Sequence, residues 1–287
     1  MDRMQEIERL ARPAKVRLQY VGLEWAGILN KMAQGRPHNG IVLEASPLPK
    51  VAVRALGEVH NMEDPINVKL AHMSEEERAV TGESSVLPRE VRANRYPFVL
   101  LLDRVLDPGN LGGIARSAYF LGVDAVVVTR SGSAPTSAVT IKASAGALET
   151  MALLTAGNPV EFIKKSKVHG WKVFAGVSPS SHSMRHKSDK DFISPASALA
   201  SRPCILVVGG EGEGVSWQIL QHIDGHVGIA QAPRNDGLNI VESLNVSVAT
   251  ALMAQQFLDN STRPRPNTMR ELDSSSISTD DQKLKIF

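Results

Sequence analysis

The stretch Ile205–Ser216, with the sequence ILVVGGEGEGVS, constrains the fold more than any other part of the chain. It opens with an unbroken apolar run after Pro203, which is typical of a strand buried on both faces. Four glycines then occupy six positions, so the backbone there can adopt positive φ angles and approach a ligand closely. Ser216 suits the N-cap of a helix beginning at Trp217. Strand, glycine loop and helix start describe the crevice where open α/β sheets bind ligands.

The glycine loop, residues 209–214, differs from the common phosphate-binding loops. It lacks the Lys-Ser/Thr ending of a P-loop, and it does not match the spaced G-x-G-x-x-G of a dinucleotide fold. Its carboxylates, Glu211 and Glu213, would repel a phosphate chain and favour a ligand with positive character, such as a sulfonium. A tight turn with solvated glutamates explains the same residues equally well, so the loop alone leaves both interpretations open.

Composition sets wide limits on the function. A chain of 287 residues with 43% apolar content suits one or two domains with a sizeable core. The net charge of +2 permits a nucleic-acid partner without requiring one. The single cysteine, Cys204, excludes an intrachain disulfide and is expected to be a small buried hydrophobe. No apolar run approaches the ~20 residues that span a bilayer, so no membrane partner is expected.

From about residue 97 onward, apolar runs alternate with helical patterns. This alternation predicts an α/β fold, a parallel sheet with helices on both faces. Strands are expected at 97–103, 124–129, 149–156, 171–177, 205–210 and 226–230. Helices are expected at about 110–122, 137–149, 158–170, 217–223 and 243–258.

The flanking regions have weaker signals. Residues 1–49 predict a helix ending at Pro13, a short strand at 16–22, a second helix at 23–35 and an apolar strand after the Asn39-Gly40 turn. These elements are thin for an independent core. Residues 50–96 begin with a possible strand and continue as a polar linker or irregular insertion. Residues 260–287, rich in Ser, Asp and Pro, are expected to be disordered.

Three segments carry polar residues beside expected helix starts. The first is NLGGIAR, residues 110–116, whose two central glycines each cost ~1 kcal/mol in a helix relative to Ala. The second is the glycine loop with Glu211, and the third is SLN at 243–245, where Ser243 is expected to cap the last helix and Asn245 to lie in its first turn. Each segment alone also has a plain structural explanation, a surface cation for Arg116 and simple caps for Asn110 and Ser243.

Taken in order, NxGxxxR, GGEGEG and SLNVSVA resemble the three motifs of the SpoU/TrmH branch of SPOUT RNA methyltransferases. The resemblance covers residues 97–259. It is strongest to the mitochondrial members that act on large-subunit rRNA, through LLDRVLDPGNLGGIARSAYFLGVD and KASAGALE. The segment GRPHNGIVLEASPLP resembles the end of the ribosomal-protein-like RNA-binding domain that precedes the methyltransferase domain in such proteins, so residues 1–49 are expected to be the C-terminal part of that α/β domain.

The resemblance implies a C-terminal deep trefoil knot, a homodimer formed through the knot region and S-adenosylmethionine as methyl donor. It also implies 2′-O-ribose methylation of ribosomal RNA, at a guanosine of the mitochondrial large-subunit rRNA, and hence a mitochondrial location. No metal is required. The implied catalytic residues are Arg116, Asn110, Glu211, Ser243 and Asn245, and the implied donor contacts are Gly209, Gly210, Gly214, Ile229 and Leu244.

Arg116 is the catalytic residue that the resemblance proposes, and its role has two forms. A guanidinium gives up its proton only with difficulty, so it would act as a base only if its neighbours perturbed it strongly. Otherwise it stabilises the developing alkoxide or holds a phosphate. Glu211 would then orient Asn110, Arg116 or both.

Two rival functions remain for comparison. An oxidoreductase would need a dinucleotide fingerprint, which NLGGIAR does not supply. A non-catalytic RNA-binding assembly factor of the same fold would keep the RNA contacts without turnover. Possible phosphate contacts, each more often a plain surface charge, are Arg92, Arg95, Arg104 and Arg185-His186-Lys187.

Overall fold

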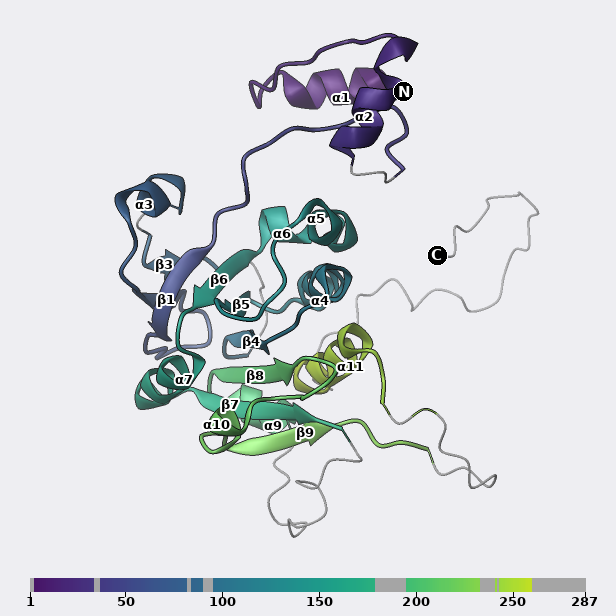
Figure 1. Ribbon diagram of the computed structural model, residues 1–287. Helices are drawn as coiled ribbons and strands as arrows, with labels where there is room; N and C mark the ends of the chain where they lie inside the picture. Colours follow the sequence, from purple (N-terminus) through teal and green to yellow (C-terminus); the bar gives the residue numbers. More distant parts are fainter. Residues whose placement is uncertain are drawn as a thin grey trace, which may run out of the picture.

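The computed structural model describes residues 3–33, 37–81, 84–89, 95–178, 195–232, 241 and 243–259. Within these residues nine strands form one sheet in the order β3-β2-β1-β6-β5-β4-β8-β7-β9 (Figure 1). Neighbours from β1 to β9 are parallel, whereas β2 and β3 join antiparallel at the edge. The strands are β1 Val51–Leu56, β2 Ile66–Leu70, β3 Val86–Leu87, β4 Phe98–Asp103, β5 Ala125–Thr129, β6 Ala152–Ala156, β7 Lys172–Val177, β8 Cys204–Gly209 and β9 Gly225–Gly228.

Helices connect these strands and cover both faces of the sheet. The α-helices are α1 Arg3–Ala11, α2 Ala26–Met32, α3 Glu75–Thr81, α4 Pro108–Leu121, α5 Ala138–Ser144, α6 Ala147–Thr150, α7 Pro159–Val168, α9 Pro195–Ser201, α10 Trp217–Leu220 and α11 Val246–Leu258, and a 3-10 turn, η1 Leu23–Trp25, precedes α2. The predicted parallel α/β fold with helices on both faces is therefore confirmed.

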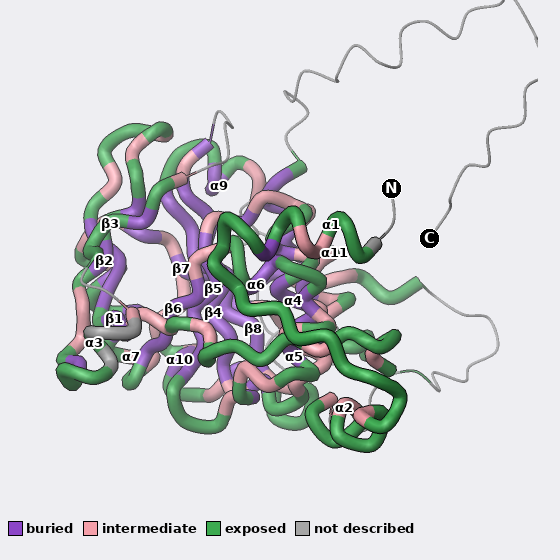
Figure 2. The backbone as a smooth tube through the Cα atoms, turned by 90° about the horizontal axis from the view of Figure 1, so that it is seen from above, coloured by how far each residue is buried: buried purple, intermediate pink, exposed green. Residues whose placement is uncertain are grey.

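Two apolar layers lie on opposite faces of the sheet. Alternate residues of β4 enter each layer, because successive side chains of a strand point to opposite faces. Phe98, Leu100 and Leu102 pack with α4, α6, α9 and α11, whereas Val99 and Leu101 pack with α7 and α10. Figure 2 shows the buried strands in the middle of the molecule and the exposed chain around them. All six residues of β4 and all six of β8 are buried, which explains why both read as unbroken apolar runs.

The expectation of a linker or irregular insertion at 50–96 differs from the described part of that segment. Strands β1, β2 and β3 extend the sheet, and β1 pairs parallel with β6. The pattern was hidden because β2 alternates buried and exposed side chains over only five residues. The predicted helix at 137–149 is also divided: Ala145 and Gly146, both with positive φ, separate α5 from α6.

In the N-terminal segment the two predicted helices are present as α1 and as η1 with α2. The strands predicted at 16–22 and after the Asn39-Gly40 turn are absent from the described residues there, which have no strand pairing. Neither segment joins the sheet, so among the described residues neither has a neighbouring strand to accept its backbone hydrogen bonds. Figure 1 shows α1 and α2 above the sheet, joined to β1 by an extended stretch of chain.

Candidate functional site

The carboxyl ends of β4, β8, β7 and β9 meet at one edge of the sheet, since these strands are parallel. Asp103 at the end of β4 pairs with Gly209 at the end of β8. Ala175 of β7 pairs with both Val207 and His226, so Gly209 and Gly228, each two residues further on, lie level in the sheet. The register therefore places the glycine loop and Ile229, which follows β9, at the same edge. This is the edge where open α/β sheets bind ligands.

The glycine loop folds back on itself at this edge. Gly214, with φ of 65°, donates its N–H to the carbonyl of Gly210 at 3.0 Å. A Cβ on Gly209 would lie 1.9 Å from the carbonyl carbon of Gly214, so only glycine permits this close approach. The N–H of Ser216 donates to Asp103 Oδ2 at 2.9 Å and ties the end of the loop to β4. The loop is thus a tight turn that is held by hydrogen bonds at both of its ends.

Three side chains from three distant segments meet beside this loop. Asn110 Nδ2 donates to Glu211 Oε1 at 3.0 Å. Asn245 Nδ2 donates to Asn110 Oδ1 at 2.9 Å and to Glu211 Oε1 at 3.0 Å. These three residues, hereafter the amide–carboxylate network, join the start of α4, the glycine loop and the start of α11. The network spans 135 residues of sequence, so it links three of the segments that the sequence singled out.

The start of α4 explains how Asn110 is free to join the network. Asp107 is the N-cap, its carboxylate accepting from the N–H of Asn110 at 2.7 Å, and Pro108 occupies the first turn. The helix therefore begins two residues earlier than predicted. Because Asp107 supplies the cap, the Asn110 side chain projects out of the first turn toward Glu211.

The start of α11 corrects the prediction made for the third segment. Asn245, not Ser243, is the N-cap, and its Oδ1 accepts from the N–H of Ser247 at 2.9 Å. Ser243 is exposed and lies two residues before the cap, and Leu244 is also exposed. The physical reason is that one amide performs both tasks: its oxygen caps the helix while its nitrogen reaches the network. Such double use of one side chain leaves no signal in residue spacing.

Arg116 lies outside the network. It is exposed on α4, six residues after Asn110, which corresponds to about 9 Å along a helix axis. Among the described residues it makes no hydrogen bond or ion pair with Asn110, Glu211 or Asn245. The structure therefore brings together three of the five predicted catalytic residues and leaves Arg116 and Ser243 apart from them.

The cations predicted as phosphate contacts differ in burial and in their ion-pair partners. Arg95 is buried and paired with Asp124 Oδ2 at 2.7 Å, so the prediction of an RNA contact is wrong for this residue. Arg104 is partly exposed and paired with Glu213 Oε2 at 2.5 Å, on the rim of the glycine loop. Arg92 and the segment 185–187 lie outside the described residues.

Three further features concern metal ligands, membrane-spanning helices and the cysteine in the part of the chain that the structure describes. No group of three His, Cys, Asp or Glu side chains there could hold a metal ion. No helix found there is both long and apolar enough to cross a membrane. Cys204 lies fully buried in β8, and burial raises the pKa of its thiol to about 12, with Asp224 adding to the shift. The prediction of a buried hydrophobe is confirmed.

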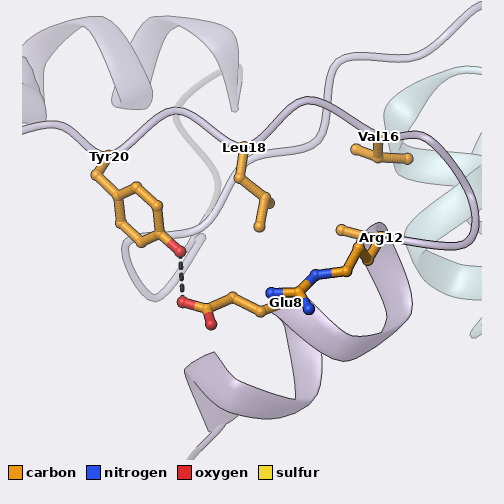
Figure 3. Close-up of a pocket in the computed structure, with 6 residues that line it drawn as sticks. Glu8, Arg12, Val16, Leu18 and Tyr20 are labelled. Carbon is orange, nitrogen blue, oxygen red and sulfur yellow. Dashed lines mark hydrogen bonds between the residues drawn. The ribbon is translucent and has the colours of Figure 1, made fainter.

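A cavity of about 280 Å³ lies elsewhere, in the N-terminal segment. Figure 3 shows its lining, with Glu8 from α1 and Arg12 from the turn after α1 near Leu18 and Tyr20 of the following stretch. Tyr20 donates its hydroxyl proton to Glu8 Oε1 at 2.5 Å, and this bond raises the pKa of Tyr20. The cavity shares no residue with the amide–carboxylate network.

A parallel α/β sheet that presents a glycine loop and a polar network from three segments at one edge defines an enzyme-type ligand site. The sequence pattern of the SpoU rRNA Methylase family matches residues 97–255, which include every residue of that site. The chain belongs to this family, and the resemblance drawn from the three motifs is confirmed.

Individual relatives of this chain are also rRNA methyltransferases by name. Mitochondrial rRNA methyltransferase 1 of Saccharomyces cerevisiae is 34% identical over 243 residues, covering 80% of this chain and 57% of the relative. The protein of the same name in Schizosaccharomyces pombe is 34% identical, with 80% and 72% covered. The 23S rRNA (guanosine-2′-O-)-methyltransferase RlmB of Yersinia pestis is 32% identical, with 58% and 61% covered. The chain thus spans little more than half of the S. cerevisiae relative.

Proposed function

We propose that the protein transfers a methyl group from S-adenosylmethionine to a ribose 2′-hydroxyl of RNA, at a guanosine of the mitochondrial large-subunit rRNA. Membership of the SpoU family supports the reaction class. The names of the relatives support ribosomal RNA, a guanosine 2′-oxygen and a mitochondrial location. The observation that carries the proposal is the amide–carboxylate network, which unites the three motif segments at the ligand-binding edge of the sheet.

The donor fits the edge beside the network. Bound S-adenosylmethionine supplies an electrophilic methyl group on a positively charged sulfur. Gly210 and Gly214 expose backbone beside the buried Gly209, and Ile229 and Leu244 offer apolar contacts. The loop carboxylates suit a cationic ligand. Any side chain on Gly209 would meet the backbone of Gly214, so the loop keeps its shape only with glycine there.

The open hydrogen-bonding capacity of the network matches a hydroxyl group. Both Asn110 and Asn245 donate to Glu211 Oε1, so Oε2 stays free of any partner among the described residues. One N–H of Asn110 Nδ2 is open within the same set. An acceptor and a donor side by side can hold a hydroxyl, which both donates and accepts. We therefore assign Glu211 and Asn110 to orienting the ribose, and Asn245 to holding both.

Arg116 supplies the positive charge that the amide–carboxylate network lacks. In the transfer, the 2′-oxygen bonds to the methyl carbon as the carbon–sulfur bond breaks, sulfur keeps the electron pair, and the hydroxyl proton leaves to solvent or a nearby base. The exposed guanidinium stabilises the developing negative oxygen or holds the adjacent phosphate. Ser243, exposed just before α11, adds a hydrogen bond to the bound ligands.

A homodimer through the knot region would bring Arg116 to a site. Four apolar side chains are exposed on α4 and α11, which pack together. Tyr119 and Phe120 follow Arg116 on α4, and Val248 and Leu252 lie one turn apart on α11. Burial of such a face against a second copy would remove apolar surface from water. We propose this dimer together with the deep trefoil knot of the C-terminal part, both of which the family resemblance implies.

The remaining parts of the chain have proposed roles by position. Residues 1–49 are the C-terminal part of a ribosomal-protein-like RNA-binding domain, and residues 97–259 are the methyltransferase domain. Between them, the described part of 50–96 extends the methyltransferase sheet. Residues 260–287, the predicted tail, lie outside the described residues.

Labelled S-adenosylmethionine and mitochondrial large rRNA test the reaction directly. Arg116→Ala should lower transfer roughly 10²- to 10³-fold while donor affinity changes little, because the guanidinium acts on the ribose rather than the donor. Arg54→Ala, an exposed arginine of β1, is the matched control and should leave transfer unchanged. Loss of donor binding in Arg116→Ala would refute the assigned role. RNA binding by the unaltered protein without label in ribose would favour the non-catalytic assembly factor.

A further inference from the structure

Ser247, the second residue of α11, makes two hydrogen bonds to one atom of the network. Its backbone N–H donates to Asn245 Oδ1 at 2.9 Å, and its hydroxyl donates to the same oxygen at 2.6 Å. The motif segments drew attention to Ser243 and Asn245, and Ser247 was not among the predicted site residues. The signal available in the sequence was the Asn-x-Ser spacing of a capped helix start.

These bonds fix which way the Asn245 amide faces. A backbone N–H can only donate, so the atom opposite it must be oxygen, and Nδ2 must point the other way. Both lone pairs of Oδ1 are then used by Ser247, and both N–H groups of Nδ2 by Asn110 and Glu211. Every hydrogen-bonding position of the Asn245 amide is filled.

The orientation of the Asn245 amide, fixed by Ser247, determines the orientation of the other two side chains of the network. Because Nδ2 of Asn245 donates to Asn110, the receiving atom of Asn110 is its oxygen, and its nitrogen must face Glu211. Two N–H groups consequently converge on Glu211 Oε1. The carboxylate is held by one oxygen, and its other oxygen has no partner among the described residues. Hydrogen-bond polarity thus runs one way, from Ser247 to the carboxylate.

The hydroxyl of Ser247 has a separate task from its N–H. The terminal torsion of an asparagine is broad and roughly two-fold, so one donor alone restrains it weakly. A second donor at 2.6 Å on the same oxygen narrows that motion. The site also leaves room for this hydroxyl: a Cβ on Gly113 would lie 3.3 Å from Ser247 Cβ and 3.4 Å from its Oγ, so glycine in α4 keeps the space clear.

We propose that Ser247 is a positioning residue for methyl transfer, whose hydroxyl locks the Asn245 amide and thereby the orientation of the Glu211 carboxylate. This inference rests on the proposed function, since its effect on rate appears only if the chain transfers methyl groups. Ser247 itself contacts neither donor nor ribose. Its influence therefore falls on the rate of the chemical step rather than on donor binding.

The test compares Ser247→Ala, Ser247→Val and Ser247→Thr in the full chain. Threonine keeps the hydroxyl and valine has nearly the same shape without it, so the pair separates hydrogen bonding from volume. Loss of one hydrogen bond of this kind should lower kcat about three- to tenfold in the alanine and valine variants. KM for S-adenosylmethionine should stay within about twofold, and threonine should restore at least half of kcat. Ser201→Ala, which removes a hydroxyl bonded only to its own helix, is the control.

A second readout does not depend on catalysis. Nuclear magnetic resonance on protein labelled at asparagine nitrogen resolves the side-chain amide signals, and the pair missing in Asn245→Ser identifies Asn245. That pair should shift and broaden in Ser247→Ala and Ser247→Val and return in Ser247→Thr. Unchanged kcat and unchanged Asn245 signals in Ser247→Ala would overturn the positioning role, as would failure of threonine to restore either. If the unaltered protein transfers no methyl group, the proposed function fails, and the amide signals alone decide the role of Ser247.

Discussion

The N-terminal segment and the nine-stranded sheet differ in how many of their residues are buried. Among the described residues before Val51, only Ala11 is buried, and Leu23 and Tyr20 are 94% and 64% exposed. Every residue of β4 and β8, by contrast, is buried between two layers of helices. Figure 2 shows this contrast: the chain that includes α1 and α2 is mostly exposed, whereas the strands of the sheet are buried.

The difference indicates where the stability of the chain resides. Helices of nine and seven residues, such as α1 and α2, are marginal in water unless tertiary packing supports them. The described hydrogen bonds between this segment and the rest of the chain include one from Lys142 Nζ, on α5, to the carbonyl of Pro37 at 2.9 Å. We infer that the core around the sheet is sufficient for folding. The N-terminal segment then contributes little to stability and instead contacts other molecules.

The largest effect should follow from Asp124→Ala, in the buried part of the sheet. Asp124 accepts from Arg89 Nε at 2.9 Å, from Arg95 at 2.7 Å and from the N–H of Phe98 at 2.8 Å. The three charged side chains are nearly inaccessible, so removing the carboxylate leaves two buried cations without their partner. The free energy of unfolding should fall by about 3–5 kcal/mol, measurable by urea titration.

The matching change in the N-terminal segment is Glu8→Gln, which removes the carboxylate that accepts from Tyr20. Because this pair is exposed, we expect no measurable change in the urea midpoint. If Glu8→Gln destabilised the protein as much as Asp124→Ala, the contrast between the two regions would be wrong.

A smaller effect is expected from Gly209→Ala, at the site itself. The added Cβ would overlap the backbone of Gly214, so the glycine loop must open by rearranging. Overpacking of this kind costs up to about 3 kcal/mol, which corresponds to roughly hundredfold weaker binding of S-adenosylmethionine. Isothermal titration calorimetry measures this loss of donor affinity.

Gly212→Ala is the control within the same loop, since a Cβ there meets nothing within 4 Å. Gly27→Ala, equally unobstructed, is the control in α2. Donor affinity in both variants should stay close to that of the unaltered protein. Equal losses in Gly209→Ala and Gly212→Ala would show that the loop tolerates no side chain for reasons other than the contact with Gly214.

The sequence predicted the elements whose signal is local. The strands around Phe98 and Ile205 are continuous apolar runs because both faces are buried, and the parallel fold followed from their alternation with helices. The edge strands β2 and β3 were missed because each gains its strand conformation from pairing with a neighbour rather than from its own composition.

Interactions between distant residues explain the other differences. Arg95 looked like a surface cation because nothing in the chain near it reveals Asp124, 29 residues away. Ser243 looked like a cap because serine commonly is one, whereas the amide of Asn245 is held by Asn110 and Glu211 from other segments. The motif residues were identified by resemblance, and their hydrogen bonds needed the folded chain.

Deleting residues 1–44 should also have only a small effect on stability. The described part of this segment buries a single side chain and donates or accepts few bonds outside itself, so the unfolding temperature of the sheet should change by no more than about 3 °C, equivalent to about 1 kcal/mol. Donor affinity should be retained, whereas affinity for large rRNA should fall if the segment contacts RNA. Lys142→Ala, which removes the hydrogen bond to Pro37 but keeps the segment, should leave RNA affinity nearly intact. A drop of 10 °C or more on deletion would place part of the core in the N-terminal segment and remove the distinction between the two regions.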